Sequence, residues 1–308
     1  MLLWWKYVRT VKENEHVMEI MLEWFTENNM KVNIDKFQYI IFGKKYENGF
    51  VTLNGNIIPS QTEVKLLGIN IDSKLNFDYH IHEICRKTGR KLNVLRRLSR
   101  NLDEKKKLLL FYSFILSNFQ YCSVIWHFCS KGNSIKLEKI HYQALKYVFN
   151  DHSSSYQFLL RKANRPPRIY VQRLRNILTE IYKIINKLGP SYLHDMYQLQ
   201  NVDYECRNVL KLQQRKFRSM KYGYNCLIYQ GSKIWNTCDN DLKLSMDLNQ
   251  FKLNVNNWQP PQCNCSVCVL CQLNVMWNSR MFCDAHFVYT HSLYITISHC
   301  IMSVNSCF

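Results

Sequence analysis

The sequence predicts an α+β fold in three successive parts: a small β-containing start, a mainly helical basic body and a Cys-rich end. Asn54-Gly55 stands between two short apolar runs, which is a strong β-hairpin signal. From about Tyr79 to Leu188, apolar residues recur at three- and four-residue steps in one segment after another, which is typical of amphipathic helices. Four cysteines then lie within nine residues, Cys263–Cys271.

The first part is predicted to contain a helix followed by short strands. The apolar side chains within the segment 17–25 share one helical face, and Asn28-Asn29 is expected to end this helix. Residues 37–42 are expected to form a strand buried on both faces. The hairpin pairs residues 50–53 with Ile57-Ile58, and Pro59 ends its second strand. Residues 64–71 read as one more apolar strand before a polar turn at 72–76.

The second part is predicted to be a succession of helices. The expected segments are 81–98, 108–119, 137–148, a short helix before Pro166-Pro167, and 171–188 ended by Gly189-Pro190. Residues 108–119 are apolar on nearly every face, so this helix is expected in the core. It lacks the unbroken apolar length of a membrane span. Beyond it, residues 191–258 are expected to form loops, a short strand at Cys226–Tyr229 and a last helix at Leu248–Trp258.

The composition favours a folded chain with a polyanionic partner. Of the 308 residues, 47% are hydrophobic, which excludes wholesale disorder, while Gly (9) and Pro (6) are too scarce for collagen or low-complexity linkers. Lys and Arg (41) outnumber Asp and Glu (23), for a net charge of +18. A field this positive favours nucleic acid as partner first and an acidic membrane second. We expect nucleic acid, with no membrane and no small-molecule substrate.

The cysteines and the N-terminus predict an intracellular protein. Thirteen cysteines are scattered along the chain, and the apolar run Leu2–Trp5 before Lys6 is too short for a secretory signal. We therefore expect reduced thiols and a location in the nucleus or cytoplasm, without secretion.

The positive charge is concentrated in three segments. Residues 86–107 carry ten Lys or Arg against two acids, residues 161–187 eight against one, and residues 207–221 six against none. Within the first segment, seven cations lie opposite the apolar stripe of the expected helix. They are Arg86, Lys87, Arg90, Lys91, Arg96, Arg97 and Arg100. Such a face neutralises phosphates without reading bases. The alternative is an ordinary solvated helix face.

The cysteine cluster is a candidate zinc site. Cys263, Cys265, Cys268 and Cys271 supply four soft thiolate ligands, as a closed tetrahedral site requires. The Cys-x-Cys step strains a one-metal arrangement, and Cys283 or His286 could replace one ligand. The alternative is a set of reduced cysteines with no ligand role.

Known catalytic patterns are absent from the sequence. There is no G-x-S-x-G, Walker loop, H-E-x-x-H or dinucleotide glycine pattern, and no two Asp are adjacent. Asp239 and Asp241 lie in a late polar loop. Two-metal phosphoryl transfer needs clustered carboxylates, so we expect no polymerase-type catalytic centre in this sequence.

Five sequence elements occur in a definite order along the chain. They are Trp24-Phe25-x2-Asn28-Asn29-Met30-Lys31-Val32-Asn33-x2-Lys36; Val64-Lys65-Leu66-Leu67-Gly68-Ile69-x-Ile71-Asp72-x2-Leu75-x-Phe77-x2-His80-Ile81; Tyr121-Cys122-x3-Trp126; Gly231-x-Lys233-Ile234-Trp235-Asn236; and Phe251-Lys252-x5-Trp258 followed by the cysteines. In this order they resemble the C-terminal part of non-LTR (LINE-type) retrotransposon reverse transcriptases.

The resemblance implies a domain order. Residues 1–78 would be a palm remnant with a primer-grip hairpin, 79–190 a helical thumb-like domain, 191–258 a post-thumb region, and 259–308 a Cys-rich segment and tail. Leu66, Leu67, Gly68 and Ile69 would form the primer grip. Lys36 would match the palm lysine thought to assist proton transfer to pyrophosphate.

The sequence departs from this family at its catalytic centre. The Tyr-x-Asp-Asp turn and an upstream Asp should precede Trp24, but the preceding 23 residues contain no Asp. The family's Mg²⁺ ligands are therefore absent here, and Lys36 would be vestigial. The resemblance implies an inactive fragment of an RNA-directed DNA polymerase that retains primer–template binding. Two alternatives stay open: an exon of a longer active reverse transcriptase, and an unrelated basic, zinc-binding nucleic-acid-binding protein.

Overall fold

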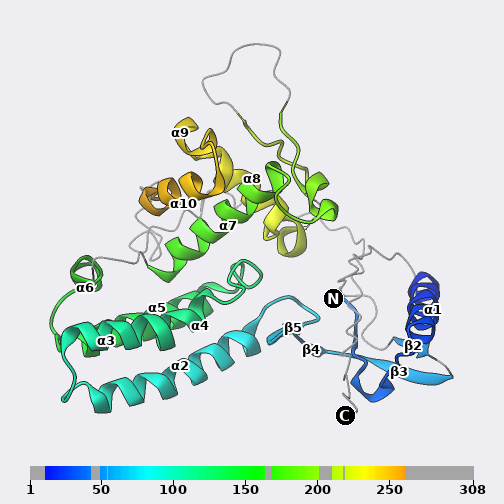
Figure 1. Ribbon diagram of the computed structural model, residues 1–308, viewed down its shortest axis with the longest axis horizontal. Helices are drawn as coiled ribbons and strands as arrows, with labels where there is room; N and C mark the ends of the chain where they lie inside the picture. The colour runs from blue at the N-terminus through cyan, green and yellow to red at the C-terminus, as the bar shows by residue number, and fades with distance from the viewer. Residues whose placement is uncertain are drawn as a thin grey trace. The chain divides into compact units, whose positions relative to one another are not determined.

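The computed structural model describes residues 11–42, 49–53, 55–163, 168–200, 210–217 and 219–260. These residues form a mainly helical α+β fold with two small sheets, as the sequence predicts in general terms (Figure 1). They divide into two compact units, the first ending at Glu83 and the second beginning at Ile84. None of the described helices has the length and hydropathy needed to cross a membrane.

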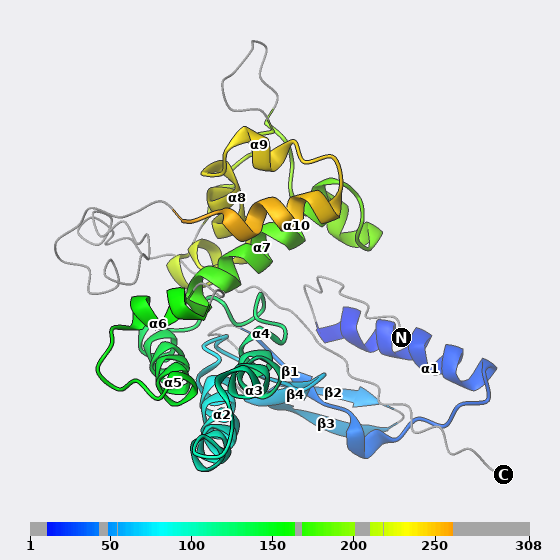
Figure 2. The same ribbon diagram turned by 60° about the vertical axis from the view of Figure 1, so that its left-hand side comes forward.

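The first unit contains a three-stranded sheet with a helix against it. Helix α1 (Val11–Glu27) contacts the sheet, whose strand order is β1 (Tyr39–Ile40), β3 (Asn56–Gln61), β2 (Phe50–Leu53) (Figure 2). Strand β1 runs parallel to β3, and β2 and β3 form the predicted antiparallel hairpin. The core here consists of Met18, Phe37, Tyr39, Ile41, Val51, Leu53 and Ile58.

Helix α1 ends where the sequence predicts, but its buried face is shifted. Asn29 adopts a left-handed conformation with φ 53°, so the Asn pair ends the helix. Met18 and Phe25 are buried, whereas Ile20 and Trp24 are half exposed. The helical face predicted to be buried therefore includes Ile20 and Trp24, which the small sheet does not cover.

The strands of the three-stranded sheet differ from the prediction in two places. The strand expected at 37–42 is hydrogen-bonded only at Tyr39–Ile40, because β3 offers it partners only at Ser60 and Gln61. Pro59 does not end β3: the donor toward β2 at this point is Ser60, whose N–H binds the Gly49 carbonyl at 2.7 Å.

The single strand expected at 64–71 is wrong. The structure has a hairpin of β4 (Glu63–Leu66) and β5 (Ile69–Asp72). Its two-residue turn is Leu67-Gly68, with φ 48° and 86°. Positive φ at both positions gives the type I′ turn whose twist matches paired strands.

The second unit contains the helical succession. Its elements are α2 (Asp78–Leu98, which begins in the first unit), α3 (Glu104–Leu110), η2 (Phe111–Leu116, a π-helical turn), α4 (Ser117–Gln120), α5 (Lys131–Phe149), α6 (Tyr156–Lys162) and α7 (Ile169–Ile185). Helices α2, α3 and α5 lie side by side (Figures 1 and 2). Helix α7 ends before the predicted Leu188 because Lys187 takes a left-handed conformation, φ 54°.

The segment 108–119 is helical but is not buried on every face. Phe111, Ile115 and Phe119 are buried, whereas Leu109 and Phe114 are exposed. The π-helical turn lies at the centre of this segment. The segment therefore lies at the margin of its core.

Residues after 190 complete a core that begins on α7. They form η3 (Ser191–Met196), η4 (Met220–Tyr224), α8 (Leu227–Asn236), α9 (Asn240–Lys243) and α10 (Leu248–Asn257), the last as predicted. The strand predicted at Cys226–Tyr229 is wrong. These residues begin α8, whose inward positions Gly231 and Trp235 lie one helical turn apart.

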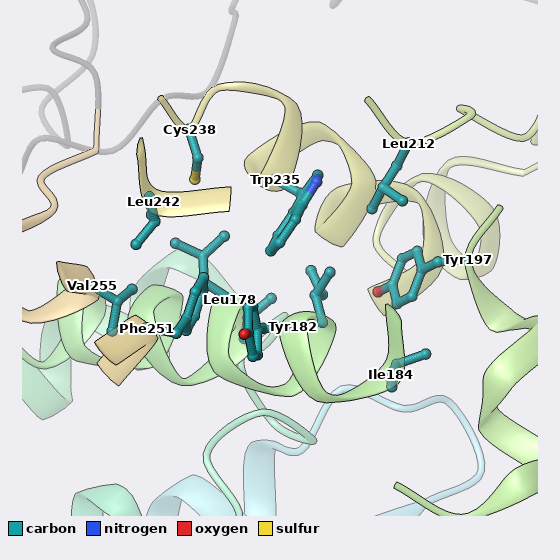
Figure 3. Close-up of a cluster of buried hydrophobic side chains, with 12 residues drawn as sticks. Leu178, Tyr182, Ile184, Tyr197, Leu212, Trp235, Cys238, Leu242, Phe251 and Val255 are labelled. Carbon is teal, nitrogen blue, oxygen red and sulfur yellow. The ribbon is translucent and has the colours of Figure 1, made fainter. Parts of the chain in front are cut away.

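This core is built around stacked aromatic rings (Figure 3). The ring of Phe251 stacks on that of Tyr182, with 4.2 Å between the ring centroids. The Trp235 ring also stacks with Phe251, with 6.1 Å between their centroids. Residues on both sides of position 190 thus contribute to one core.

Candidate nucleic-acid interface

Helix α2 is strongly amphipathic. Ile81, Ile84, Thr88, Leu92 and Leu95 are buried, at the three- and four-residue spacing that the sequence shows. At the last turn the stripe departs from the prediction, since Leu98 is 41% exposed and Ser99 is buried in its place. The Ser99 hydroxyl donates to the Arg96 carbonyl at 2.7 Å, which satisfies it locally. One face of α2 is thus fixed in the protein, and the opposite face is free to carry charge.

The predicted cations lie on that opposite face. Arg86, Lys87, Arg90, Arg96, Arg97 and Arg100 are exposed, and Lys91 is half-buried. The Lys91 ammonium donates to the Asn118 side-chain oxygen of α4 at 2.9 Å. Lys91 therefore links two helices, and the other six residues make up what we call the α2 basic face.

Most of the α2 basic face lacks acidic partners. Within the described ranges, no carboxylate lies within ion-pair distance of five of its members, which are Lys87, Arg90, Arg96, Arg97 and Arg100. Solvated helix faces commonly alternate charges of opposite sign at i, i+4. This face instead carries charge of one sign over three turns.

The C-terminal end of the α2 basic face opens into a groove of about 770 Å³. Its walls come from α2 and from the end of α5, and they are Asn93, Arg96, Arg97, Ser99, Arg100, Tyr147, Asn150 and His152. Three guanidinium groups and no carboxylate line it. The aromatic rings of Tyr147 and His152 meet edge to face at 5.5 Å. Guanidinium groups beside aromatic rings can hold phosphates and stack with bases.

Local backbone chemistry places the α5 side of the groove. Asn150 ends α5 in a left-handed conformation with φ 53°, which Asn tolerates well. The next residue, Asp151, accepts hydrogen bonds from Ser154 and from the backbone and hydroxyl of Ser153. These bonds, those of Ser154 foremost, lower the pKa of Asp151 to about 2. The ionised Asp151 carboxylate therefore stabilises the turn that carries His152.

The sequence predicts the cations on the α2 side of this groove but not the residues on its α5 side. Tyr147, Asn150 and His152 carry no motif. The Asn-Asp pair after an apolar helical repeat signals a helix end, but nothing local indicates that this end lies beside Arg96 and Arg100.

The residues expected to form a primer grip lie at the β4–β5 turn. Leu66 and Ile69 point into the protein and are buried, whereas Leu67 and Gly68 are exposed at the tip. After β5, the Asp72 carboxylate accepts hydrogen bonds from the backbone N–H groups of Lys74, Asn76 and Phe77. This turn leads directly into α2.

Two of the other motif segments have structural roles. Trp126 is fully buried and its indole donates to the Tyr121 carbonyl. Trp235 donates to the Leu210 carbonyl, and the Asn236 amide pairs with both backbone groups of Leu212 (Figure 3 shows Trp235 and Leu212). These residues hold the second unit together.

The remaining predicted residues do not gather into a catalytic or metal site in the described parts. Lys36 is exposed in the short helix η1 (Ile34–Lys36). Asp239 lies at the N-cap position of α9 without a side-chain capping bond, and Asp241 lies in the first turn of this helix. No group of three or more His, Cys, Asp or Glu among the described residues could hold a metal ion. Cys263, Cys265, Cys268, Cys271, Cys283 and His286 lie outside the described residues, so zinc binding stays a prediction.

No protein-family model, curated protein or solved structure significantly matches this chain.

Proposed function

We propose that this chain binds a nucleic-acid primer–template through the α2 basic face and the adjoining groove, as a reverse-transcriptase remnant without polymerase activity of its own. The observation that carries the binding is the α2 basic face, whose charges are all positive and which continues into a groove with three arginines and no acid. The five ordered sequence elements support the reverse-transcriptase origin and hence the preference for a primed hybrid.

The expected lack of polymerase activity follows from the absence of clustered carboxylates in the sequence. Nucleotide transfer depends on metal ions and positioning, and no pair of adjacent Asp occurs in the sequence. Purified chain supplied with Mg²⁺ and nucleotides should therefore extend a primer on RNA no faster than buffer. If this sequence is an exon of a longer polymerase, the same basic face would hold primer–template for aspartates supplied by that product.

Fluorescence anisotropy with a labelled oligonucleotide tests the binding. Five cations without acidic partners predict that log affinity falls with log salt at a slope of about −4, so affinity drops more than 100-fold between about 50 and 200 mM salt. Arg96→Glu/Arg97→Glu/Arg100→Glu should abolish binding at moderate salt. The matched control is Lys131→Glu/Lys136→Glu/Lys139→Glu, which makes the same charge change on exposed positions nearer the other end of α5 and should lower affinity only modestly.

Two results would overturn this function. Equal losses in both triple variants would mean that only net charge matters. Measurable primer extension would contradict the inactive-remnant proposal. Stoichiometric zinc together with equal affinity for primed and unprimed strands would favour the alternative, a basic zinc-binding protein without polymerase ancestry.

A further inference from the structure

Arg173 of α7 is a buried cation with no carboxylate beside it. Only 1% of its surface is exposed. Within the described residues no Asp or Glu lies within ion-pair distance of its guanidinium. Burying an uncompensated charge is among the costliest arrangements in a protein, so this guanidinium needs an anion from its surroundings.

The contacts of Arg173 include one side chain that can become an anion near neutral pH. One terminal nitrogen donates to the Ser134 hydroxyl at 2.7 Å, and the other donates to the Cys129 Sγ at 3.6 Å. The planar group also lies 5.1 Å from the centre of the Trp126 ring and 5.6 Å from that of Tyr170. Its Nε is buried with no hydrogen-bond partner in the described residues. Serine and tryptophan do not ionise in this range, which leaves Cys129 and Tyr170.

The other titratable groups around Arg173 are excluded as counter-ions. Burial raises the pKa of Tyr170 to about 12, so its phenol stays neutral. Burial and the nearby Arg173 hold the pKa of His127 well below its usual range, so the imidazole is neutral too. The Glu138 carboxylate instead accepts hydrogen bonds from the Tyr156 hydroxyl and the Tyr170 backbone N–H.

We infer that Cys129 is held as a thiolate by Arg173 and is a nucleophilic modification site for soft electrophiles. A guanidinium donor stabilises a thiolate far more than a neutral thiol, which is a weak acceptor. Cys129 is also partly exposed rather than buried. Reactive cysteines occur where a cation lies beside the sulfur of a partly exposed cysteine, and Arg173 and Cys129 form such a pair.

Cys85 and Cys238 lack this setting. Burial raises the pKa of the Cys85 thiol despite the nearby Lys136, and the charge of Cys129 raises it further. Burial raises the pKa of Cys238 to about 12. Both are therefore protonated at neutral pH and serve as internal references for slow reaction.

Iodoacetamide gives a simple form of the reaction. A lone pair of the Cys129 thiolate forms an S–C bond, the C–I bond breaks, and iodide leaves with its electron pair. No proton has to be removed at that moment, so the rate at Cys129 should change little with pH. The thioether is neutral, so modification leaves Arg173 without its counter-charge and should loosen the segment between α4 and α5.

The experiment is pulse alkylation of the full chain with isotope-coded iodoacetamide, followed by peptide mapping. At about pH 6, Cys129 should react at least about tenfold faster than Cys122, which is also partly exposed but accepts no hydrogen bond from a guanidinium in the described part of the chain. Arg173→Gln should reduce the Cys129 rate to that of Cys122. The matched control is Arg175→Gln: Arg175 is also buried on α7, but it donates to the Trp258 carbonyl, so the Cys129 rate should not change.

The mapping also reports whether a variant has unfolded, because fast alkylation of the buried Cys238 would show it. If a variant unfolds, the inference is tested instead by the pH dependence of the Cys129 alkylation rate in the unaltered chain. A Cys129 rate that is nearly level from about pH 6 to 8.5 supports the thiolate. A Cys129 rate that rises about tenfold per pH unit over this range would overturn the inference.

Discussion

At the scale of single residues, a buried hydrogen-bond chain joins α5, α6 and α7. The Tyr156 hydroxyl donates to Glu138 at 2.6 Å, so it must accept the bond from His141 Nδ1, also at 2.6 Å. The His141 proton therefore lies on Nδ1. The opposite nitrogen, Nε2, is buried without a partner in the described residues, with the Phe111 ring 5.3 Å from the imidazole centre. Adding a proton there would place an unpaired charge among aromatic rings.

This arrangement predicts acid sensitivity that depends on His141. Burial lowers its pKa to about 3, against about 6.5 in an unfolded chain. The unfolded chain thus takes up a proton first as pH falls, and stability is lost from about pH 6.5 downward until about pH 3. His141 alone contributes about 1.4 kcal/mol of unfolding free energy per pH unit in this window.

Urea denaturation from about pH 6 to 4 tests this dependence. His141→Phe should reduce the pH slope of the unfolding free energy by about 1.4 kcal/mol per unit. The slope from His127, which is also buried and neutral, should remain. The exposed His82→Gln is the control and should keep the full slope. An unchanged slope in His141→Phe would mean that this imidazole is already protonated in the fold.

At the scale of elements, the backbone of the β4–β5 turn is strained at Leu67, and this strain can be tested. Leu67 adopts φ 48°, a left-handed conformation that costs a leucine about 1 kcal/mol, whereas Asn-Gly is the preferred pair for this turn. Leu67 is 45% exposed, so replacing it removes little burial. Leu67→Asn should stabilise the hairpin by about 0.5–1 kcal/mol, and Gly68→Ala at φ 86° should destabilise it by about 1 kcal/mol.

Hydrogen exchange of the amides in residues 63–72 measures both effects locally. Slower exchange is expected in Leu67→Asn and faster exchange in Gly68→Ala, with the amides of α7 unchanged in each. Faster exchange in Leu67→Asn together with slower exchange in Gly68→Ala would show that the turn is not of type I′ in solution.

Elements with local signals could be predicted from the sequence, and this turn could not. Helices α5, α6 and α10 begin at Ser130, Ser155 and Asp247, whose side chains accept from backbone N–H groups three residues on. A Leu-Gly turn inside an apolar run has no such marker, so residues 64–71 read as one strand. The α2 basic face can be predicted from the charges in the sequence. The groove beside it also needs the end of α5, and hydrophobic periodicity does not predict that this end lies next to α2.

At the scale of the whole molecule, the two units have separate cores. One consists of seven buried residues from α1 to β3, and the other contains the stacked Trp235, Phe251 and Tyr182. The first unit is a small sheet whose β1 pairs over two residues only. Stability follows buried apolar area, so the first unit should open at a lower urea concentration than the second.

Two buried residues distinguish independent from joint unfolding. Val51 in β2 is 1% exposed and Leu178 in α7 is fully buried. Truncating a core side chain to alanine costs about 2–5 kcal/mol for leucine and somewhat less for valine. With hydrogen exchange followed over a urea series, Val51→Ala should lower the midpoint for β2 and β3 amides and leave α7 unchanged. Leu178→Ala should lower the α7 midpoint and leave β2 and β3 at their original, earlier midpoint. If either substitution shifts both sets of amides equally, the units unfold as one body, and the two cores are parts of a single cooperative structure.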